Sequence, residues 1–154
     1  MDQITQQRIA LLHPSLRDEV TALVKKADEA LTGNAKMRIV QGLRTFPEQD
    51  ALYAQRPKVT NAKGGQSYHN YGLAIDFCLI IDGKQVSWNS TKDSDNDHVA
   101  DWEEVIRIFE AAGWKSGRAF NDLPHFEKSA LNWRDLLKKY QAGDFIAGTK
   151  YINL

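Results

Sequence analysis

Large apolar residues occupy every second position from residue 73 to residue 81, and the second face carries Ala74, Asp76 and Cys78. A period of two predicts a β-strand with one buried face. Asp76 is therefore expected to point away from the main core. The pair Asp82-Gly83 follows and is a typical hairpin signal, which leads to a short strand over 84–88. Together the two strands predict an antiparallel sheet.

Three longer segments have apolar residues at helical spacing instead of in alternation. The first covers 16–31, where Ser15 is the expected N-terminal cap and Gly33 the expected stop. The second covers 102–112 and the third covers 129–141. Shorter elements are expected as a helix over 2–12, a strand over 37–41, a helix after the capping-box pair Thr45 and Glu48, and an edge strand over 149–154.

These elements describe an α+β fold in which a small antiparallel sheet is flanked by helices. A chain of 154 residues is long enough to bury one sizeable core and matches the size of one domain. No repeat, linker or low-complexity segment divides it. We therefore expect a single domain over residues 1–154, present as a monomer.

The charge balance restricts the classes of partner. The chain has 20 Lys and Arg residues and 20 Asp and Glu residues, so its formal net charge is zero. This balance argues against a nucleic-acid binder that relies on phosphate neutralisation. No apolar run approaches the roughly 18 residues that a membrane span needs, and the first residues lack the pattern of a secretory signal. We expect a protein that is made in the cytoplasm, and Cys78, as the single cysteine, cannot form an intrachain disulfide.

Two segments far apart in the chain hold the candidate chemistry. His69 and Asp76 belong to the first, and Asp122 and His125 belong to the second. A lone histidine is more often a surface or hydrogen-bonded residue, but two of the four histidines fall in the segments that also carry these acids. A catalytic zinc site typically has three protein ligands and keeps a fourth position for the water that it activates. His69, Asp76 and His125 can supply the three ligands, which leaves Asp122 as the base.

The spacing of these residues resembles the paired motifs of one enzyme family. The first segment reads Ser67-x-His69-x-x-Gly72-x-Ala74-x-Asp76, and the second reads Asp122-x-Pro124-His125-Phe126-Glu127. The pair is similar to that of the VanY-like zinc peptidases, which include D-Ala-D-Ala carboxypeptidases and L-alanyl-D-glutamate endopeptidases. The resemblance extends to residues 42–49 and to Gly113-Trp114, so it covers most of the chain. The form with aspartate before the last histidine is most similar to the L-alanyl-D-glutamate endopeptidases of phage endolysins and related cell-wall hydrolases.

The resemblance implies a fold shared with the Hedgehog signalling domain and hydrolysis of the peptidoglycan stem peptide, with L-Ala–D-Glu as the expected bond. Zinc is the implied cofactor and Asp122 the implied general base. Arg44 and Ser67 are the implied substrate-binding residues, since a guanidinium suits a carboxylate or a developing oxyanion. Without the resemblance, Arg44 would be interpreted as a surface arginine or part of a structural salt bridge. For a phage-encoded enzyme, the resemblance implies release to the wall through a holin.

Other functions stay open at this point. A D,D-carboxypeptidase would release free C-terminal D-Ala, so its products separate it from an endopeptidase. A metal-containing wall-binding module without catalysis, as among the signalling relatives, would not need Asp122, and the presence of this acid argues against it. A nuclease with a His/Asp metal site is disfavoured by the neutral charge.

The stretch 93–104 has acids at positions 1, 3, 5, 9 and 12, which is the spacing of a calcium-binding EF-hand loop. His98 stands where that loop has the glycine of its sharp turn, and Ala100 stands where a larger apolar residue is usual. The alternative is an acidic helix start with Asp97 as its cap. In the calcium interpretation, the ion orders one wall of the active-site cleft. The five candidate ligands are Asp93, Asp95, Asp97, Asp101 and Glu104.

Overall fold

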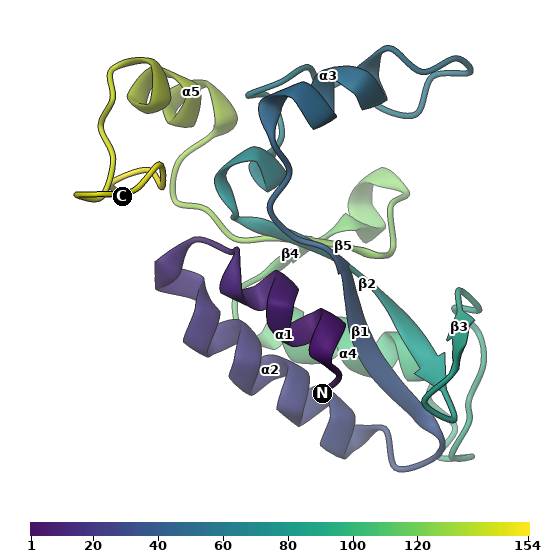
Figure 1. Ribbon diagram of the computed structural model, residues 1–154. Helices are drawn as coiled ribbons and strands as arrows, with labels where there is room; N and C mark the ends of the chain where they lie inside the picture. Colours follow the sequence, from purple (N-terminus) through teal and green to yellow (C-terminus); the bar gives the residue numbers. More distant parts are fainter.

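The antiparallel sheet is built around β2 (Ala74–Ile81), the strand that the alternating pattern predicts. In the computed structural model, which describes residues 1–154, β1 (Ala35–Gln41) pairs with one edge of β2. The other edge pairs with β5 (His125–Glu127) near the start of β2 and with β3 (Gln85–Ser87) near its end. The last strand, β4 (Lys115–Ser116), pairs with β5. The predicted antiparallel sheet is thus confirmed (Figure 1).

The hairpin between β2 and β3 has the turn that its two residues predict. Asp82 has φ 53° and Gly83 has φ 69°. Two consecutive residues with positive φ are the mark of the turn whose twist matches that of antiparallel strands.

Helices cover the sheet along its length. α1 (Gln3–Ala10) and α2 (Arg17–Ala30) lie side by side against β1, and α4 (Asp101–Ala111) packs on α2 and β4 (Figure 1). Two further helices, α3 (Phe46–Tyr53) and α5 (Trp133–Gln141), lie beyond the end of the sheet where β1 ends and β2 begins. None of the helices is both long and apolar enough to span a bilayer.

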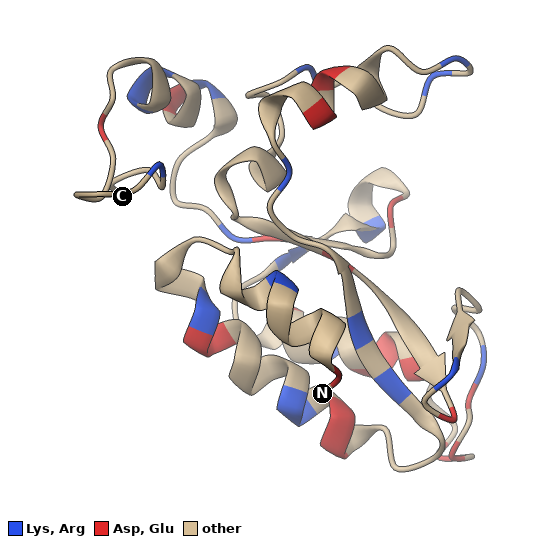
Figure 2. Ribbon diagram, in the orientation of Figure 1, with Lys and Arg blue, Asp and Glu red and all other residues tan.

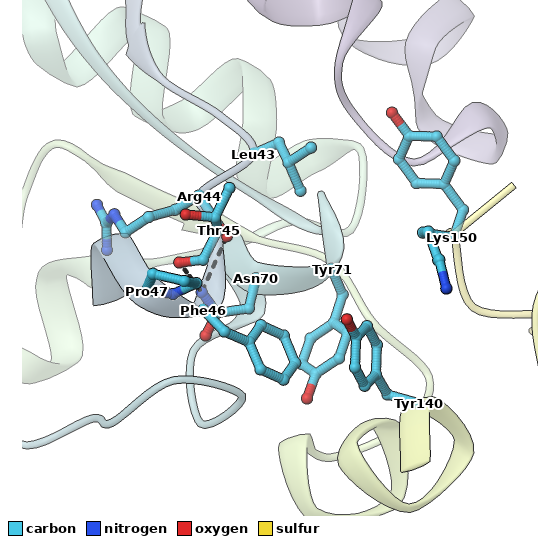
Figure 3. A pocket seen from close by; sticks show the side chains of 10 residues that line it. Leu43, Arg44, Thr45, Phe46, Pro47, Asn70, Tyr71, Tyr140 and Lys150 are labelled. Atoms are coloured by element: carbon cyan, nitrogen blue, oxygen red, sulfur yellow. Dashed lines mark hydrogen bonds between the residues drawn. The ribbon is translucent and has the colours of Figure 1, made fainter. Parts of the chain in front are cut away.

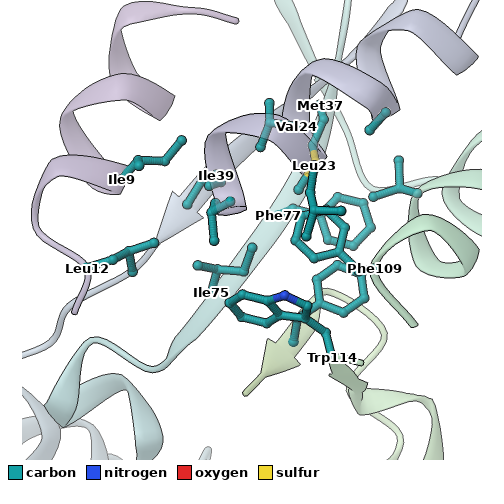
Figure 4. Close-up of a cluster of buried hydrophobic side chains, with 14 of the residues drawn as sticks. Ile9, Leu12, Leu23, Val24, Met37, Ile39, Ile75, Phe77, Phe109 and Trp114 are labelled. Atoms are coloured by element: carbon teal, nitrogen blue, oxygen red, sulfur yellow. The ribbon is translucent and has the colours of Figure 1, made fainter. Parts of the chain in front are cut away.

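The core lies between the sheet and the helices α1, α2 and α4 (Figure 4). It takes the alternate residues of β2 that the sequence pattern assigns to the buried face. The rings of Phe77 and Phe109 both stack on Phe126, with centroid distances of 5.3 and 4.5 Å. These contacts join β2, α4 and β5, so the strand that carries His125 is fixed to the strand that carries Asp76.

The first predicted cap is wrong. The helix expected over 16–31 begins at Arg17, after a short 3-10 turn over Pro14–Leu16, and no side chain caps it. Ser15 instead donates its backbone N–H to the ring of His13, at 3.2 Å. The imidazole thus caps the turn, because Pro14 favours a 3-10 start and brings the Ser15 amide over the ring. Gly33 does not end the helix either, because α2 stops three residues earlier.

The edge strand expected over 149–154 is also wrong. The segment makes only one isolated bridge, between Phe145 and Ile152. Ile152 is fully buried, and its carbonyl oxygen lies 2.8 Å from Nε2 of His13. The C-terminal segment is therefore held by the buried side chain of Ile152, by the His13 contact and by a hydrogen bond from the Tyr151 hydroxyl to the Leu11 carbonyl at 2.9 Å, and it adds no strand to the sheet.

Candidate active-site cleft and metal centre

The register of the sheet brings the first two candidate ligands together. β2 and β5 pair so that Asp76 stands directly opposite His125. Side chains at opposed positions of antiparallel strands lie on the same face of the sheet. Nδ1 of His125 accordingly lies 3.2 Å from Oδ1 of Asp76. Both side chains lie on the face of the sheet that turns away from the core, as the sequence predicts for Asp76.

His69 reaches the same point from the short helix η2 (Tyr68–Tyr71), just before β2. Its Nε2 lies 3.3 Å from Oδ2 of Asp76. Its Nδ1 lies 2.8 Å from the carbonyl oxygen of Gly42, which can only accept a hydrogen bond. Nδ1 therefore carries the proton, and Nε2 presents its lone pair toward Asp76.

Gly72 is required where η2 turns into β2. Its φ is 68°, and a Cβ there would come within 2.6 Å of the backbone nitrogen of His13. Only glycine combines a left-handed backbone with this close approach. The glycine of the first motif thus sets the path that lets His69 fold back over Asp76.

Asp122 and His125 belong to one tight turn. The carbonyl oxygen of Asp122 accepts a hydrogen bond from the His125 N–H at 3.0 Å, and the Asp122 N–H donates to the Gly117 carbonyl at 2.9 Å. A Cβ on Gly117 would overlap the Asp122 carbonyl oxygen. The Phe77 N–H donates to the Pro124 carbonyl at 3.0 Å, which ties the turn to β2. The turn that carries Asp122 and His125 is therefore anchored at both sides.

Arg44 lies two residues before the start of α3, and it lines the cleft. Its Nη2 lies 3.9 Å from Oδ2 of Asp76, and its Nη1 donates to Oε1 of Gln49 at 2.9 Å. Gln49 is almost fully buried and also donates to the carbonyl oxygen of Ala62 at 2.9 Å. The sequence analysis did not predict this role of Gln49. The only signal was that a polar residue lies on the buried side of α3. The capping box of Thr45 and Glu48 at the start of α3 is confirmed.

All six predicted catalytic, substrate-binding and zinc-binding residues line one cleft of about 330 Å³. The loop 57–66 contributes Val59 and Thr60 to the lining of the cleft. The Ser67 hydroxyl also accepts a hydrogen bond from the His69 N–H at 3.3 Å, which makes it the cap of η2. The cleft is lined by Arg44, Gln49, Leu52, Val59, Thr60, Ser67, His69, Asp76, Asp122 and His125.

The charges in the cleft are strongly coupled. Burial would raise the pKa of Asp76, but its contacts with the imidazole groups of His125 and His69 outweigh burial and hold that pKa far below its usual range. Burial would lower the pKa of His125, but hydrogen bonds to Asp76 and Glu127 raise it to about 9. Burial and the negative charge of Asp76 raise the pKa of Asp122. Both histidines thus face carboxylates in a partly buried site, an arrangement that suits a bound cation.

The donor set fits zinc. His69, Asp76 and His125 each offer one ligand atom, and these atoms lie within 4.8 Å of one another. Two imidazoles and one carboxylate are a ligand set that catalytic zinc takes. The second ring nitrogen of each histidine has its own partner, the Gly42 carbonyl for His69 and Oε1 of Glu127, at 3.3 Å, for His125. Such outer partners fix ligand rings in orientation.

A second cavity, also of about 330 Å³, lies between α3 and the C-terminal segment (Figure 3). Aromatic rings of Phe46, Tyr71 and Tyr140 line it. Figure 3 shows the side chain of Arg44 pointing away from these rings. No histidine or acid lines this cavity, so it lacks the metal-ligating and acidic groups that the first cleft brings together.

The acidic stretch 93–104 lies far from the cleft. Oδ2 of Asp95 accepts a hydrogen bond from the Thr32 hydroxyl at 2.8 Å, in the connection between α2 and β1. This connection leads to Ala35, which pairs with Ile81 at the end of β2 opposite to Asp76. Acidic residues gather at that end in Figure 2. The expectation that this stretch forms a wall of the cleft is therefore wrong, because the sequence does not show at which end of the sheet the loop packs.

Comparisons with known proteins agree with this geometry. Residues 60–128 match the peptidase M15 family described as D-alanyl-D-alanine carboxypeptidase. The chain is 42% identical over 124 residues to the peptidoglycan L-alanyl-D-glutamate endopeptidase CwlK of Bacillus subtilis (strain 168). The matched region covers 75% of this chain and 72% of CwlK. The crystal structure of the Serratia marcescens L-Ala D-Glu endopeptidase ChiX shares the fold, with a TM-score of 0.57 and 20% identity over 89% of this chain and 92% of that chain.

Proposed function

The chain belongs to the M15 peptidase family, and we propose that it is a zinc-dependent L-alanyl-D-glutamate endopeptidase that cleaves the stem peptide of peptidoglycan. The observation that carries the proposal is the convergence of His69, Asp76 and His125 beside Asp122 in one cleft. The L-Ala–D-Glu bond is proposed from the similarity to CwlK, which bears that activity in its name. We infer that residues 1–154 act as one zinc peptidase domain and as a monomer.

His69, Asp76 and His125 would hold the zinc ion. When bound there, zinc supplies a Lewis acid for the scissile carbonyl and lowers the pKa of a bound water. The Gly42 carbonyl and the Glu127 carboxylate keep the two imidazole rings turned toward the ion. Since these partners accept hydrogen bonds, they also make the rings better electron donors.

Asp122 is the proposed general base. It lines the cleft but does not belong to the set of converging ligand atoms. A carboxylate oxygen of Asp122 accepts the proton of the attacking water and then passes it to the nitrogen of the departing D-Glu residue. The turn from Gly117 to His125 fixes the distance between base and ligand, which is what general acid–base catalysis needs.

Arg44 and Ser67 are the proposed substrate-binding residues. Gln49 holds the Arg44 guanidinium toward the cleft at 2.9 Å, so the side chain is oriented before the substrate binds. A planar guanidinium can pair with a substrate carboxylate or with the oxygen of the scissile carbonyl. The Ser67 hydroxyl already accepts from the His69 N–H, and it keeps its own hydrogen to donate to the substrate.

A D,D-carboxypeptidase is the second candidate, because the matching family is described by that activity. Such an enzyme releases single D-Ala residues from the stem peptide, whereas the endopeptidase produces a new amino terminus on D-Glu. A wall-binding module without catalysis is a third candidate, and the place of Asp122 in the cleft argues against it. For each candidate the substrate or partner is the peptidoglycan stem, so we infer that the protein acts on the cell wall, after holin-mediated release if it is phage-encoded.

The division of roles in the cleft can be tested with two variants. Asp122→Asn should keep its zinc and lose at least about 100-fold in the rate of peptidoglycan cleavage, because only proton transfer is removed. His125→Ala should lose zinc and activity together. Elemental analysis and turbidity of a sacculus suspension measure both quantities. A chelator should abolish cleavage by the wild type, and added zinc should restore it.

Near wild-type turnover of Asp122→Asn would show that another acid moves the proton. Full zinc occupancy in His125→Ala would refute the ligand set.

A further inference from the structure

We propose that residues 93–104 bind one calcium ion in a site that is separate from the cleft and that fixes the start of α4 to the connection between α2 and β1. The site is distinct from the zinc centre in residues, donor type and position. From Asp76, five residues of β2 lead to Ile81, which at about 3.3 Å per residue places the two sites roughly 17 Å apart along the strand.

The acids of this stretch converge on one point. Asp93, Asp95 and Asp101 bring one carboxylate oxygen each within 4.8 Å of one another. Asp95, Asp97 and Glu104 form a second group of the same size, and Asp95 belongs to both. The two groups together hold every acid that the EF-hand spacing assigns as a ligand.

Two buried carboxylate oxygens of this group have no hydrogen-bond partner. Asp101 is only 1% exposed, and its Oδ1 accepts a hydrogen bond from the Ser94 N–H at 3.0 Å. Its Oδ2 is buried and has no hydrogen-bond partner, and the same holds for Oε2 of Glu104. A buried carboxylate oxygen without a partner is unfavourable, because it has lost its water and gained no donor. A cation among these oxygens would replace that water.

The charge on Glu104 gives the same indication. Its carboxylate lies in one group with those of Asp95 and Asp97, with ligand oxygens within 4.8 Å of one another. Like charges so close together destabilise the ionised loop. A divalent cation would remove this repulsion.

The backbone of the loop resolves the objection that the sequence raises. His98 has φ 72°, so it adopts the left-handed conformation that glycine takes at this position. Its N–H donates to Oδ2 of Asp93 at 3.0 Å. α4 begins only at Asp101, with Ala100 before it and no side-chain cap. Asp97 is therefore not a helix cap, and the interpretation as a simple acidic helix start loses its main support.

The donor chemistry selects calcium among the common cations. Every candidate ligand is an oxygen, which excludes a preference for zinc. A flexible loop with several carboxylates suits the larger coordination number of calcium better than the strict octahedron of magnesium. Glu104, at position 12, has the length and place of the bidentate ligand in EF-hand loops.

Contacts outside the loop define what the ion would stabilise. The Thr32 hydroxyl and N–H both donate to Oδ2 of Asp95, at 2.8 and 3.2 Å. Gly33 packs so closely on the loop that a Cβ would lie 2.9 Å from the Ser94 carbonyl oxygen. An ion that fixes Asp95 therefore also fixes the connection between α2 and β1. Calcium should stabilise the fold and leave the zinc ligands in place.

Thermal unfolding of the zinc-loaded protein in calcium and in magnesium tests the proposal. Calcium at a hundredfold above its dissociation constant should raise the Tm by about 5–10 °C, and an equal concentration of magnesium should raise it less. Calorimetric titration with calcium should show one site. Asp101→Asn and Glu104→Gln should each lose the calcium-dependent rise, while their zinc content stays at the wild-type value. Asp18→Asn, an exposed acid in the first turn of α2, is the matched control and should keep the full rise.

Identical melting in calcium and magnesium together with no calorimetric heat would overturn the proposal. A full calcium-dependent rise in Glu104→Gln, whose partly exposed side chain can be changed without opening the core, would overturn the assignment of this loop. Both readouts measure stability and binding instead of cleavage, so they are independent of whether the enzyme cuts the L-Ala–D-Glu bond.

Discussion

His125 lies between two carboxylates, and each has a different role. Asp76 faces Nδ1 at 3.2 Å, and Glu127 faces Nε2 at 3.3 Å. Glu127 lies two residues further along β5, so its side chain emerges on the same face of the strand. If Nδ1 binds the metal, Glu127 accepts the hydrogen of Nε2 and orients the ring. Glu127 is thus a positioning residue that acts through His125.

Glu127→Gln should lower zinc affinity about 10-fold to 100-fold, because loss of an outer carboxylate weakens both the orientation and the donor strength of the ring. Competition with a chromophoric chelator measures the affinity without reference to activity. Glu29→Gln changes an exposed acid of α2 and should leave the affinity unchanged. Equal zinc affinity in Glu127→Gln and Glu29→Gln would contradict the positioning role.

Gln49 holds Arg44 and the loop 57–66 together through its two ends. Gln49→Leu should lower kcat/KM about 10-fold to 100-fold, since hydrogen bonds to charged groups are worth about 1.5–3 kcal/mol. The zinc content should stay at the wild-type level, because Gln49 contacts no metal ligand directly. Steady-state kinetics on a soluble stem peptide, with elemental analysis of the same sample, separates the two effects. An unchanged kcat/KM would show that Arg44 does not need its partner.

At the scale of elements, α1 supports the strand that leads to the cleft. β1 has a register irregularity between Ile39 and Gln41. The hydroxyl of Thr5, a fully buried residue of α1, accepts a hydrogen bond from the Ile39 N–H at 3.1 Å. A helix side chain thus supplies the acceptor for a strand amide at the place where the pairing with β2 is irregular.

Thr5→Val should destabilise the protein by about 1–3 kcal/mol, since it leaves a buried N–H without an acceptor at nearly constant volume. Urea denaturation measures the free energy of unfolding. Thr5→Ser keeps the hydroxyl and should retain more stability than Thr5→Val. If the serine variant is the less stable of the two, the methyl group matters more than the hydrogen bond.

Local sequence signals predicted the elements whose cause is local. The capping box at Thr45, the hairpin at Asp82-Gly83 and the alternating strand β2 are all present. The Ser15 cap is wrong because the ring of His13, two residues earlier, caps that turn, and the strand over 149–154 is wrong in a segment that has a long-range contact with the same ring. The register that sets Asp76 opposite His125 is also a long-range property, and no local pattern in either strand specifies it.

For the whole molecule, the paired motifs predicted which residues meet but not the frame around them. The outer partners of the two histidines are a backbone carbonyl and a residue two positions away, and a carbonyl has no signal in the sequence. The acidic loop was predicted from its spacing, but it packs on the connection between α2 and β1 at the far end of the sheet. Composition and motif spacing describe a chemistry, whereas the distance between two sites follows only from the packed fold.

The central claim is that this cleft uses zinc to cut the L-Ala–D-Glu bond of peptidoglycan. The most direct test is mass spectrometry of purified sacculi digested by the zinc-loaded wild type, with new amino termini labelled after digestion. We predict stem peptides that begin with a D-Glu amine, glycan strands that keep L-Ala, and neither product in a digest by Asp122→Asn. Release of single D-Ala residues without a new D-Glu terminus would contradict the claim and assign the protein to the carboxypeptidases of its family.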